Sequence, residues 1–199
     1  MNFKQLASGG GYNFDKHEFF GRYAIRKDLF LPLARTSRYD GHTTAPWPVA
    51  IHSVAVARCI ELVTNNKEMA AGGLGHDFHE SITGDITTPV AVAVGYDVVR
   101  SLQHKVQASL EEKLGIPNRL SMFTWRDQVR LGDLAALFVE KQLFCAPEPA
   151  PWNVSQPPPI WMQTMHDVML DIINEGEHHD GGASSLEAEY KRLIIGAGE

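Results

Sequence analysis

The sequence contains only two cysteines, and it has neither a long apolar run nor an excess of basic residues. Cys59 and Cys145 sit inside apolar patterns, so we expect buried free thiols rather than a disulfide framework. No segment approaches the length of a membrane span, so we expect no membrane partner. The opening stretch MNFKQLASGGGYNF lacks the charged start and the apolar core of a signal peptide, so we expect a cytoplasmic protein.

The charge balance is acidic, with 18 Lys and Arg against 24 Asp and Glu and a formal net charge of -6. Proteins that bind polynucleotides neutralise backbone phosphates with Lys and Arg, and no run of basic residues occurs here. We therefore expect no duplex nucleic acid as a partner. A chain of 199 residues with 44% hydrophobic content is long enough to bury a core, which favours a single domain over residues 1–199.

Helical periodicity dominates the apolar pattern. From Pro48 onward, Val49, Val56, Ile60 and Val63 recur at helical spacing. Similar patterns predict further helices over residues 68–82, 96–114, 125–144, 160–174 and 186–195. Alternating apolar runs are few and no βαβ rhythm occurs, so we predict an all-α helical bundle. The Gly-rich, aromatic stretch from Ala7 to Phe14 is consistent with a small N-terminal hairpin or with an irregular arm.

Proline divides the chain after this helical region. Residues 146–159 include CAPEPAPW and QPPP, and proline removes the amide donor that a helix needs, so we predict a surface loop. The loop separates a core of about residues 30–145 from C-terminal helices within residues 160–199.

Four residues on apolar helix faces are candidates for a metal site. His52 lies inside the first long helix, His76 and Asp77 follow the small-residue segment AAGGLG, and Asp133 interrupts VRLGDLAALFVE. Alone, a His on an apolar face is more often a hydrogen-bonded core residue, and an HD dipeptide is common by chance. Together, however, several buried ionisable groups are costly unless a cation neutralises them. The combination therefore predicts a metal site built between helices.

These residues belong to three segments that resemble a known family. GRYAIRKDLFLPLARTSRYDGHTTAPWPVAIHSVAVA, GLGHDFHESITGDITTPV and VRLGDLAALFVE are similar to the HD-domain phosphohydrolases, most closely the branch with the bacterial 5'-deoxynucleotidases. The resemblance spans roughly residues 7–145 and implies the HD-domain helical bundle. It also implies that the H…HD…D pattern binds a divalent metal through His52, His76, Asp77 and Asp133.

The same resemblance implies roles for further residues. The stretch HDxxExxxGD reads here with Glu80 and Asp85, which implies catalytic roles for Asp77 and Glu80 and places Asp85 at the sugar of the substrate. An arginine followed by an aromatic residue contacts the nucleotide in this branch, and here the pair is Arg38 and Tyr39. The best-known members have tryptophan in place of Tyr39, so the base preference stays open.

The branch also resembles bacteriophage enzymes that remove the whole triphosphate from dATP. Because these enzymes share the metal motif, the motif leaves monophosphate and triphosphate substrates, and a bacterial or phage origin, open. A hydrolase of a 3'-pyrophosphorylated alarmone is a further alternative, although TGDITTP is more similar to the nucleotidase branch. A non-catalytic nucleotide-binding module is another, and it requires a missing ligand or a missing Glu80.

The chemistry of the ligand set agrees with the resemblance. Two imidazoles and two carboxylates suit one transition-metal ion such as Co²⁺, Mn²⁺ or Zn²⁺ better than Mg²⁺. Such an ion lowers the pKa of water and withdraws charge from a phosphoryl oxygen. Glu80 lies one helical turn beyond His76, so in an unbroken helix its carboxylate would point to the metal side. Arg38 offers a planar fork for phosphate oxygens.

Several nearby residues have two interpretations. Trp47 is either a platform for the base or a packing anchor at the helix entrance, and His42 either approaches phosphate or lies in a solvated loop. We expect His79 to be exposed and Asp127 to cap its own helix.

Related bundles commonly pair through helices, so we expect a homo-oligomer. The apolar stripe of Trp161, Met162, Met165 and Met169 suits such an interface, and a buried core stripe explains it equally well. With a small-molecule nucleotide as substrate, the predicted reaction releases a nucleoside together with either phosphate or triphosphate.

Overall fold

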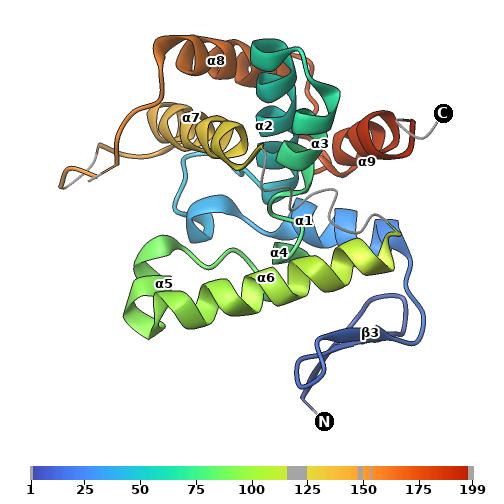
Figure 1. Cartoon of the computed structure of the whole chain (residues 1–199). Helices are drawn as coiled ribbons and strands as arrows, with labels where there is room; N and C mark the ends of the chain where they lie inside the picture. The colour runs from blue at the N-terminus through green and yellow to red at the C-terminus, as the bar shows by residue number, and fades with distance from the viewer. Residues whose placement is uncertain (1, 116–124, 148–149, 153, 197–199) are drawn as a thin grey trace.

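The computed structural model describes residues 2–115, 125–147, 150–152 and 154–196, and helices make up most of this part. Figure 1 shows a group of helices in the upper half, a long helical arm across the lower half and a small sheet near the N-terminus. The predicted all-α helical bundle is therefore confirmed, together with its small N-terminal hairpin.

The hairpin is part of a three-stranded antiparallel sheet with strands β1 (Phe3–Gln5), β2 (Gly11–Asn13) and β3 (Glu18–Phe20) in that order. A Cβ atom at Gly11 would lie 2.4 Å from the ring of Phe20, so the glycine is needed for close strand packing. The buried ring of Tyr12 contacts Phe19 edge to face, with ring centroids 4.9 Å apart. These two features explain the Gly-rich, aromatic composition of the segment.

The helical elements follow in chain order. A π-helical turn (Arg26–Phe30) leads into α1 (Leu31–Arg35), and a 3-10 turn (Arg38–Gly41) precedes α2 (Val49–Thr64). The later helices are α3 (Lys67–Gly75), α4 (Glu80–Thr83), α5 (Thr88–Val94), α6 (Tyr96–Lys113), α7 (Arg126–Phe144), α8 (Pro159–Asn174) and α9 (Ala183–Tyr190), which continues as a π-helical turn (Lys191–Ile195). Helix α2 is central, since it packs against α3, α7, α8 and α9.

The helix predicted over residues 68–82 is wrong in one respect, because it is interrupted between Gly75 and Glu80. The carbonyl of Gly73 would accept the amide of Asp77 in a continuing α-helix, but it accepts Nδ1–H of His76 at 2.6 Å. The following amides of Phe78 and Glu80 bond three residues back, as in a 3-10 turn. The interruption therefore turns the HD dipeptide out of the helical path. Helix α5 was not predicted from the sequence at all.

The C-terminal stripe belongs to the core. Trp161, Met165 and Met169 on α8 are buried within the chain, so for these residues the core alternative is confirmed. Only Met162 is partly exposed. Homo-oligomer formation stays a prediction, and this stripe does not support it.

The remaining predictions about the chain as a whole have mixed outcomes. Cys59 is a buried free thiol as expected, whereas Cys145, also free, is partly exposed. No helix in the described residues combines the length and the apolar character that a membrane span requires. Before Pro159, the described residues of the 146–159 loop form no helix, as predicted.

A glycine on α7 determines how closely this helix approaches α2. A Cβ atom at Gly132 would lie 2.9 Å from Cγ1 of Ile60 and 3.3 Å from Cγ1 of Val56. We expect Gly132→Val to lower the free energy of unfolding by about 1–3 kcal/mol, because overpacking separates the two helices. Urea denaturation measures this change. Gln142→Val, at an exposed position of the same helix, is the control for the β-branched side chain, and an equal loss in both variants would contradict the packing explanation.

Candidate metal centre

The four predicted ligands converge in one place. His52 comes from α2, His76 and Asp77 from the turn after α3, and Asp133 from α7, and these three helices pack against one another (Figure 1). The Nε2 atoms of His52 and His76 are 3.3 Å apart. Ligand atoms of His52, His76 and Asp77 all lie within 4.8 Å of one another, so the three could hold a metal ion. Residues separated by 81 positions, from 52 to 133, thus form one cluster.

Both carboxylates face the imidazoles. Oδ2 of Asp77 lies 3.2 Å from Nε2 of His76 and 3.6 Å from Nε2 of His52. Oδ1 of Asp133 lies 3.2 Å from Nε2 of His52 and 3.8 Å from Nε2 of His76. Asp133 is the more open of the two, because its side chain is 41% exposed and that of Asp77 is 15% exposed. The cluster is therefore accessible from the Asp133 side.

In both His52 and His76, a hydrogen bond at Nδ1 leaves Nε2 as the ring nitrogen that can bind a metal. Nδ1 of His52 donates to Oε1 of Glu140 at 2.7 Å, and Nδ1 of His76 donates to the Gly73 carbonyl at 2.6 Å. Since both acceptors require a proton on Nδ1, the neutral rings carry lone pairs on their facing Nε2 atoms. Metal-binding histidines in proteins have this arrangement, with the second ring nitrogen fixed by an acceptor.

The pKa shifts of the clustered carboxyl and imidazole groups reflect their attraction to one another. Partial desolvation by the surrounding protein opposes ionisation of Asp77 and Asp133, yet the neighbouring imidazoles hold the pKa of both carboxyls below its usual range. Burial likewise opposes charge on His76, but Asp77 and Asp133 raise its pKa well above the ordinary value. Without an ion, additional protons on the Nε2 atoms of the imidazoles compensate the carboxylates, and a bound divalent ion would take the place of these protons. The donor atoms fit a transition-metal ion.

Arg38 and Tyr39 lie beside the cluster. Nη1 of Arg38 is 4.0 Å from Oδ2 of Asp77, and its Nε and Nη2 atoms both donate to Oε2 of Glu140 at 3.3 Å. The hydroxyl of Tyr39 lies 3.1 Å from the Leu137 carbonyl and 3.2 Å from Oε2 of Glu140, so these two acceptors share its single proton. Tyr39 and Asp40 have φ angles of 55° and 51°, and such left-handed conformations in consecutive non-glycine residues occur where surrounding contacts enforce them.

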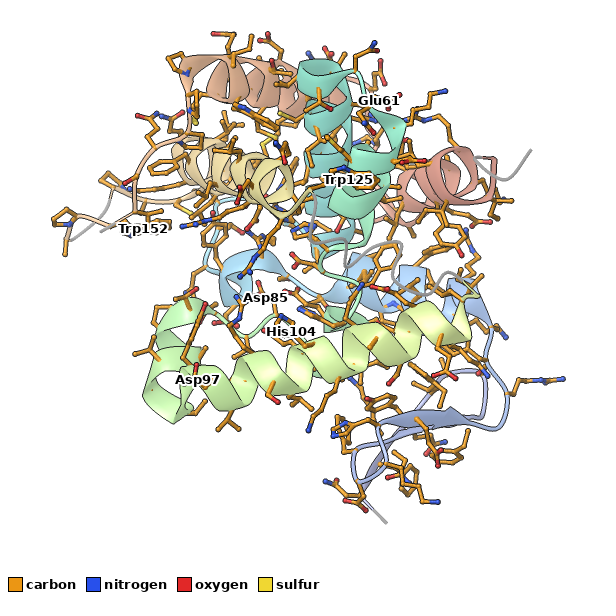
Figure 2. The ribbon with its side chains drawn as sticks, viewed as in Figure 1. Glu61, Asp85, Asp97, His104, Trp125 and Trp152 are labelled. Carbon is orange, nitrogen blue, oxygen red and sulfur yellow. The ribbon has the colours of Figure 1, made fainter. Side chains whose placement is uncertain are left out.

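The charged groups of the cluster change the pKa values of Glu80 and Asp85. The side chain of Glu80 is buried, with 6% of the residue exposed, and its Oε2 atom has no hydrogen-bond partner. Burial, together with the charges of Asp77 and Asp85, raises the pKa of Glu80 well above its usual value. Burial raises the pKa of Asp85 too, against the opposing effect of Arg38. In Figure 2, Asp85 lies between the α5–α6 pair and α7.

No protein-family model matches the chain, and no curated protein matches it. The likeness to the HD-domain phosphohydrolases therefore depends on the motif residues of the sequence alone. The structure brings four of these residues together in the cluster described above, with Arg38 beside Asp77.

Other predicted residues lie outside the cluster. Trp47 is 2% exposed and stacks on Phe144 with ring centroids 4.5 Å apart, so it is a packing anchor and we do not propose it as a base platform. His42 is exposed in the loop after the 3-10 turn. Asp127 lies in the first turn of α7, where a carboxylate favours the helix dipole, but it does not cap the helix, because the N-cap residue is Trp125 and no side chain makes a capping hydrogen bond. The expectation for His79 is wrong, because its Nδ1 atom is buried without a hydrogen-bond partner.

Two residues near the centre were not predicted. Glu140 follows Asp133 by seven residues, two helical turns, and an acid at that spacing in the apolar run LAALFVE was a usable signal. Trp152, labelled in Figure 2, comes from the proline-rich loop, and the centroid of its ring lies 6.3 Å from that of Tyr39. A contact between a loop and a distant turn has no periodic signal in the sequence.

Proposed function

We propose that this protein is an HD-type, metal-dependent phosphohydrolase that acts on nucleoside or deoxynucleoside 5'-phosphates. The observation that carries the proposal is the pair of Nε2 atoms 3.3 Å apart, fixed by Nδ1 hydrogen bonds and flanked by Asp77 and Asp133. With Nδ1 of each ring bonded to an acceptor, both Nε2 atoms are turned toward the two carboxylates, and a shared divalent ion would account for this convergence.

In this proposal, His52, His76, Asp77 and Asp133 hold one divalent ion, with Co²⁺, Mn²⁺ and Zn²⁺ as the candidates. When bound, the ion supplies Lewis acidity, which lowers the pKa of water and draws charge from a phosphoryl oxygen. The partly exposed Asp133 leaves the substrate a way to approach.

The other residues position the substrate and move protons. Arg38 presents Nη1 on the Asp77 side, where it can bind a phosphate oxygen, while Glu140 holds the rest of its guanidinium. In hydrolysis, the oxygen of water bonds to phosphorus, the bond from phosphorus to the 5' oxygen breaks, and the 5' oxygen gains a proton. Glu80 orients the water or transfers a proton, because its carboxyl is buried, unpaired and has a raised pKa. Asp85 is proposed to contact the sugar.

The first prediction concerns the reaction itself. Purified protein with Co²⁺ or Mn²⁺ is expected to release nucleoside from at least one deoxynucleotide in a panel of mono- and triphosphates, measured by chromatography of the products. Identification of the second product separates the two forms of the proposal, since orthophosphate indicates a nucleotidase and triphosphate a triphosphohydrolase. The same reactions with EDTA are the control. If no member of the panel is hydrolysed with either metal, the enzyme proposal fails and a nucleotide-binding module is favoured.

A further inference from the structure

One buried carboxylate beside the cluster has no place in the ligand set. Glu140 on α7 is fully buried, at 0% exposure. Its Oε1 atom accepts hydrogen bonds from Nε1 of Trp47 at 2.8 Å and from Nδ1 of His52 at 2.7 Å. Its Oε2 atom accepts from Nε and Nη2 of Arg38 at 3.3 Å and from the hydroxyl of Tyr39 at 3.2 Å. Both oxygens are therefore fully used.

We propose that Glu140 is a positioning residue of the metal centre, which fixes His52 so that its Nε2 atom faces the ion. The inference rests on the proposed function only in assuming that His52 is a metal ligand. It assigns to Glu140 no contact with the ion or with the substrate.

The bond to His52 determines the state of the ring. A neutral imidazole carries one proton, and the carboxylate acceptor at 2.7 Å places this proton on Nδ1. Nε2 is then free to bind a metal, and the nearby negative charge makes it a better donor. The same bond fixes the rotation of the ring about its side-chain torsion. His52 is at 0% exposure, so no water replaces Glu140 as the acceptor without a rearrangement of the core.

The remaining bonds hold the carboxylate itself in place. The other donors are Arg38 and Tyr39 in the 3-10 turn and Trp47 just before α2, so the segment that leads into α2 holds Glu140 in place. With donors from four residues on its two oxygens, the carboxylate has little freedom to rotate. The hydrogen bond from Nδ1 of His52 to this fixed carboxylate therefore restricts the rotation of the imidazole ring as well. The arrangement matches the general pattern in which a carboxylate orients a metal-bound histidine.

A role in packing alone does not explain the choice of residue. A buried charge is costly to desolvate, and an apolar side chain of similar volume commonly serves a purely structural role as well or better. The Glu140 carboxylate accepts hydrogen bonds from two residues with different roles in the proposed site, the metal ligand His52 and the phosphate-binding Arg38. Its position, two turns from Asp133 on the same helix, places ligand and positioning residue on one rigid element.

The test is Glu140→Gln, an isosteric change that removes the charge. Co²⁺ binding to metal-free protein is measured by calorimetry and by visible absorption, which depends on the ligand geometry of the ion. We expect the affinity for Co²⁺ to fall by about 10- to 100-fold, the usual effect of mutating the residue that orients a metal-binding histidine, because the amide lacks the negative charge and offers one acceptor oxygen in place of two. We also expect a changed absorption spectrum, which a packing defect elsewhere would not produce.

The matched control is Glu189→Gln. Glu189 on α9 is also buried, at 7% exposure, and it accepts hydrogen bonds from Arg58 at 2.9 Å and from Arg192 at 2.8 Å. Neither arginine belongs to the cluster, so Co²⁺ affinity and spectrum are expected to stay at the wild-type values. An equal loss in both variants would mean that buried carboxylates act only through general stability, and the proposal would be overturned.

Three further outcomes are decisive. Wild-type Co²⁺ affinity and spectrum in Glu140→Gln overturn the proposal, whatever happens to turnover. If Glu140→Gln does not fold, Glu140→Asp keeps the charge but withdraws it by one methylene, and wild-type affinity in that variant overturns the proposal too. If the wild-type protein hydrolyses no nucleotide while its Co²⁺ affinity still depends on Glu140, this inference stands and the proposed function fails.

Discussion

His76→Ala is expected to remove both metal binding and nucleotide hydrolysis. His76 lies between Asp77 and His52, with Nε2 at 3.2 Å from the carboxylate and 3.3 Å from the facing imidazole. Its loss deprives the ion of a ligand and leaves two carboxylates with a single imidazole. Replacing a residue that only supports a ligand already costs about 10- to 100-fold in affinity or activity, so loss of the ligand should cost more than about 100-fold. Calorimetry with Co²⁺ and the product assay measure the two effects.

His166→Ala is the control for this variant. His166 lies on α8 with its side chain 41% exposed, and its nearest charged partner is its neighbour Asp167 at 3.8 Å. It should leave both metal affinity and turnover unchanged. Retention of full Co²⁺ affinity by His76→Ala would show that the cluster is an ordinary hydrogen-bonded network, and the metal proposal would have to be abandoned.

Periodicity was sufficient to predict the long helices. Helix α2 and helix α7 have repeated apolar positions that face the core, and their observed bounds agree closely with the prediction. The interruption after Gly75 was missed because its cause is a side-chain bond, from His76 to the Gly73 carbonyl, which competes with the helical hydrogen bond. Helix α5 has seven residues and several exposed valines, so it gives little amphipathic signal.

The convergence of the four candidate ligands was predictable because ionisable side chains stand out on apolar helix faces. His52 and Asp133 are the clearest examples, since both interrupt runs of core residues. Glu140 meets the same criterion and was missed, because the motif of the resembling family has no place for it. Trp47 and His79 show the limit of the method, since burial depends on which elements meet and both residues lie in contacts between distant segments.

Charge explains why the site is organised in this way. Asp77, Asp133 and Glu140 are acidic groups grouped around two imidazoles and one guanidinium, so the cluster balances only when the imidazoles carry protons or a cation is present. Burial and the charges of Asp77 and Asp85 raise the pKa of Glu80, although Arg38 and His76 act in the opposite direction. Glu80 therefore differs from Asp77 and Asp133, because the surroundings favour its protonated form and favour the ionised form of the other two.

Glu80→Gln is therefore expected to separate chemistry from metal binding. The amide keeps the size of the side chain but cannot accept or release a proton in the reaction. We expect kcat to fall by about 10²- to 10⁴-fold, the usual contribution of a general acid or base. Affinity for Co²⁺ should change little, because Glu80 is not among the residues that converge on the facing Nε2 atoms.

Glu111→Gln provides the comparison, since Glu111 is another buried acid, at 2% exposure, and it lies on α6, where it accepts from Gln107 at 3.2 Å. Its turnover should stay near that of the wild type. A parallel loss of Co²⁺ affinity and kcat in Glu80→Gln would make Glu80 part of the metal shell instead. Unchanged kcat would remove it from the mechanism, because a carboxyl group that takes part in proton transfer cannot be replaced by an amide without a large loss of rate.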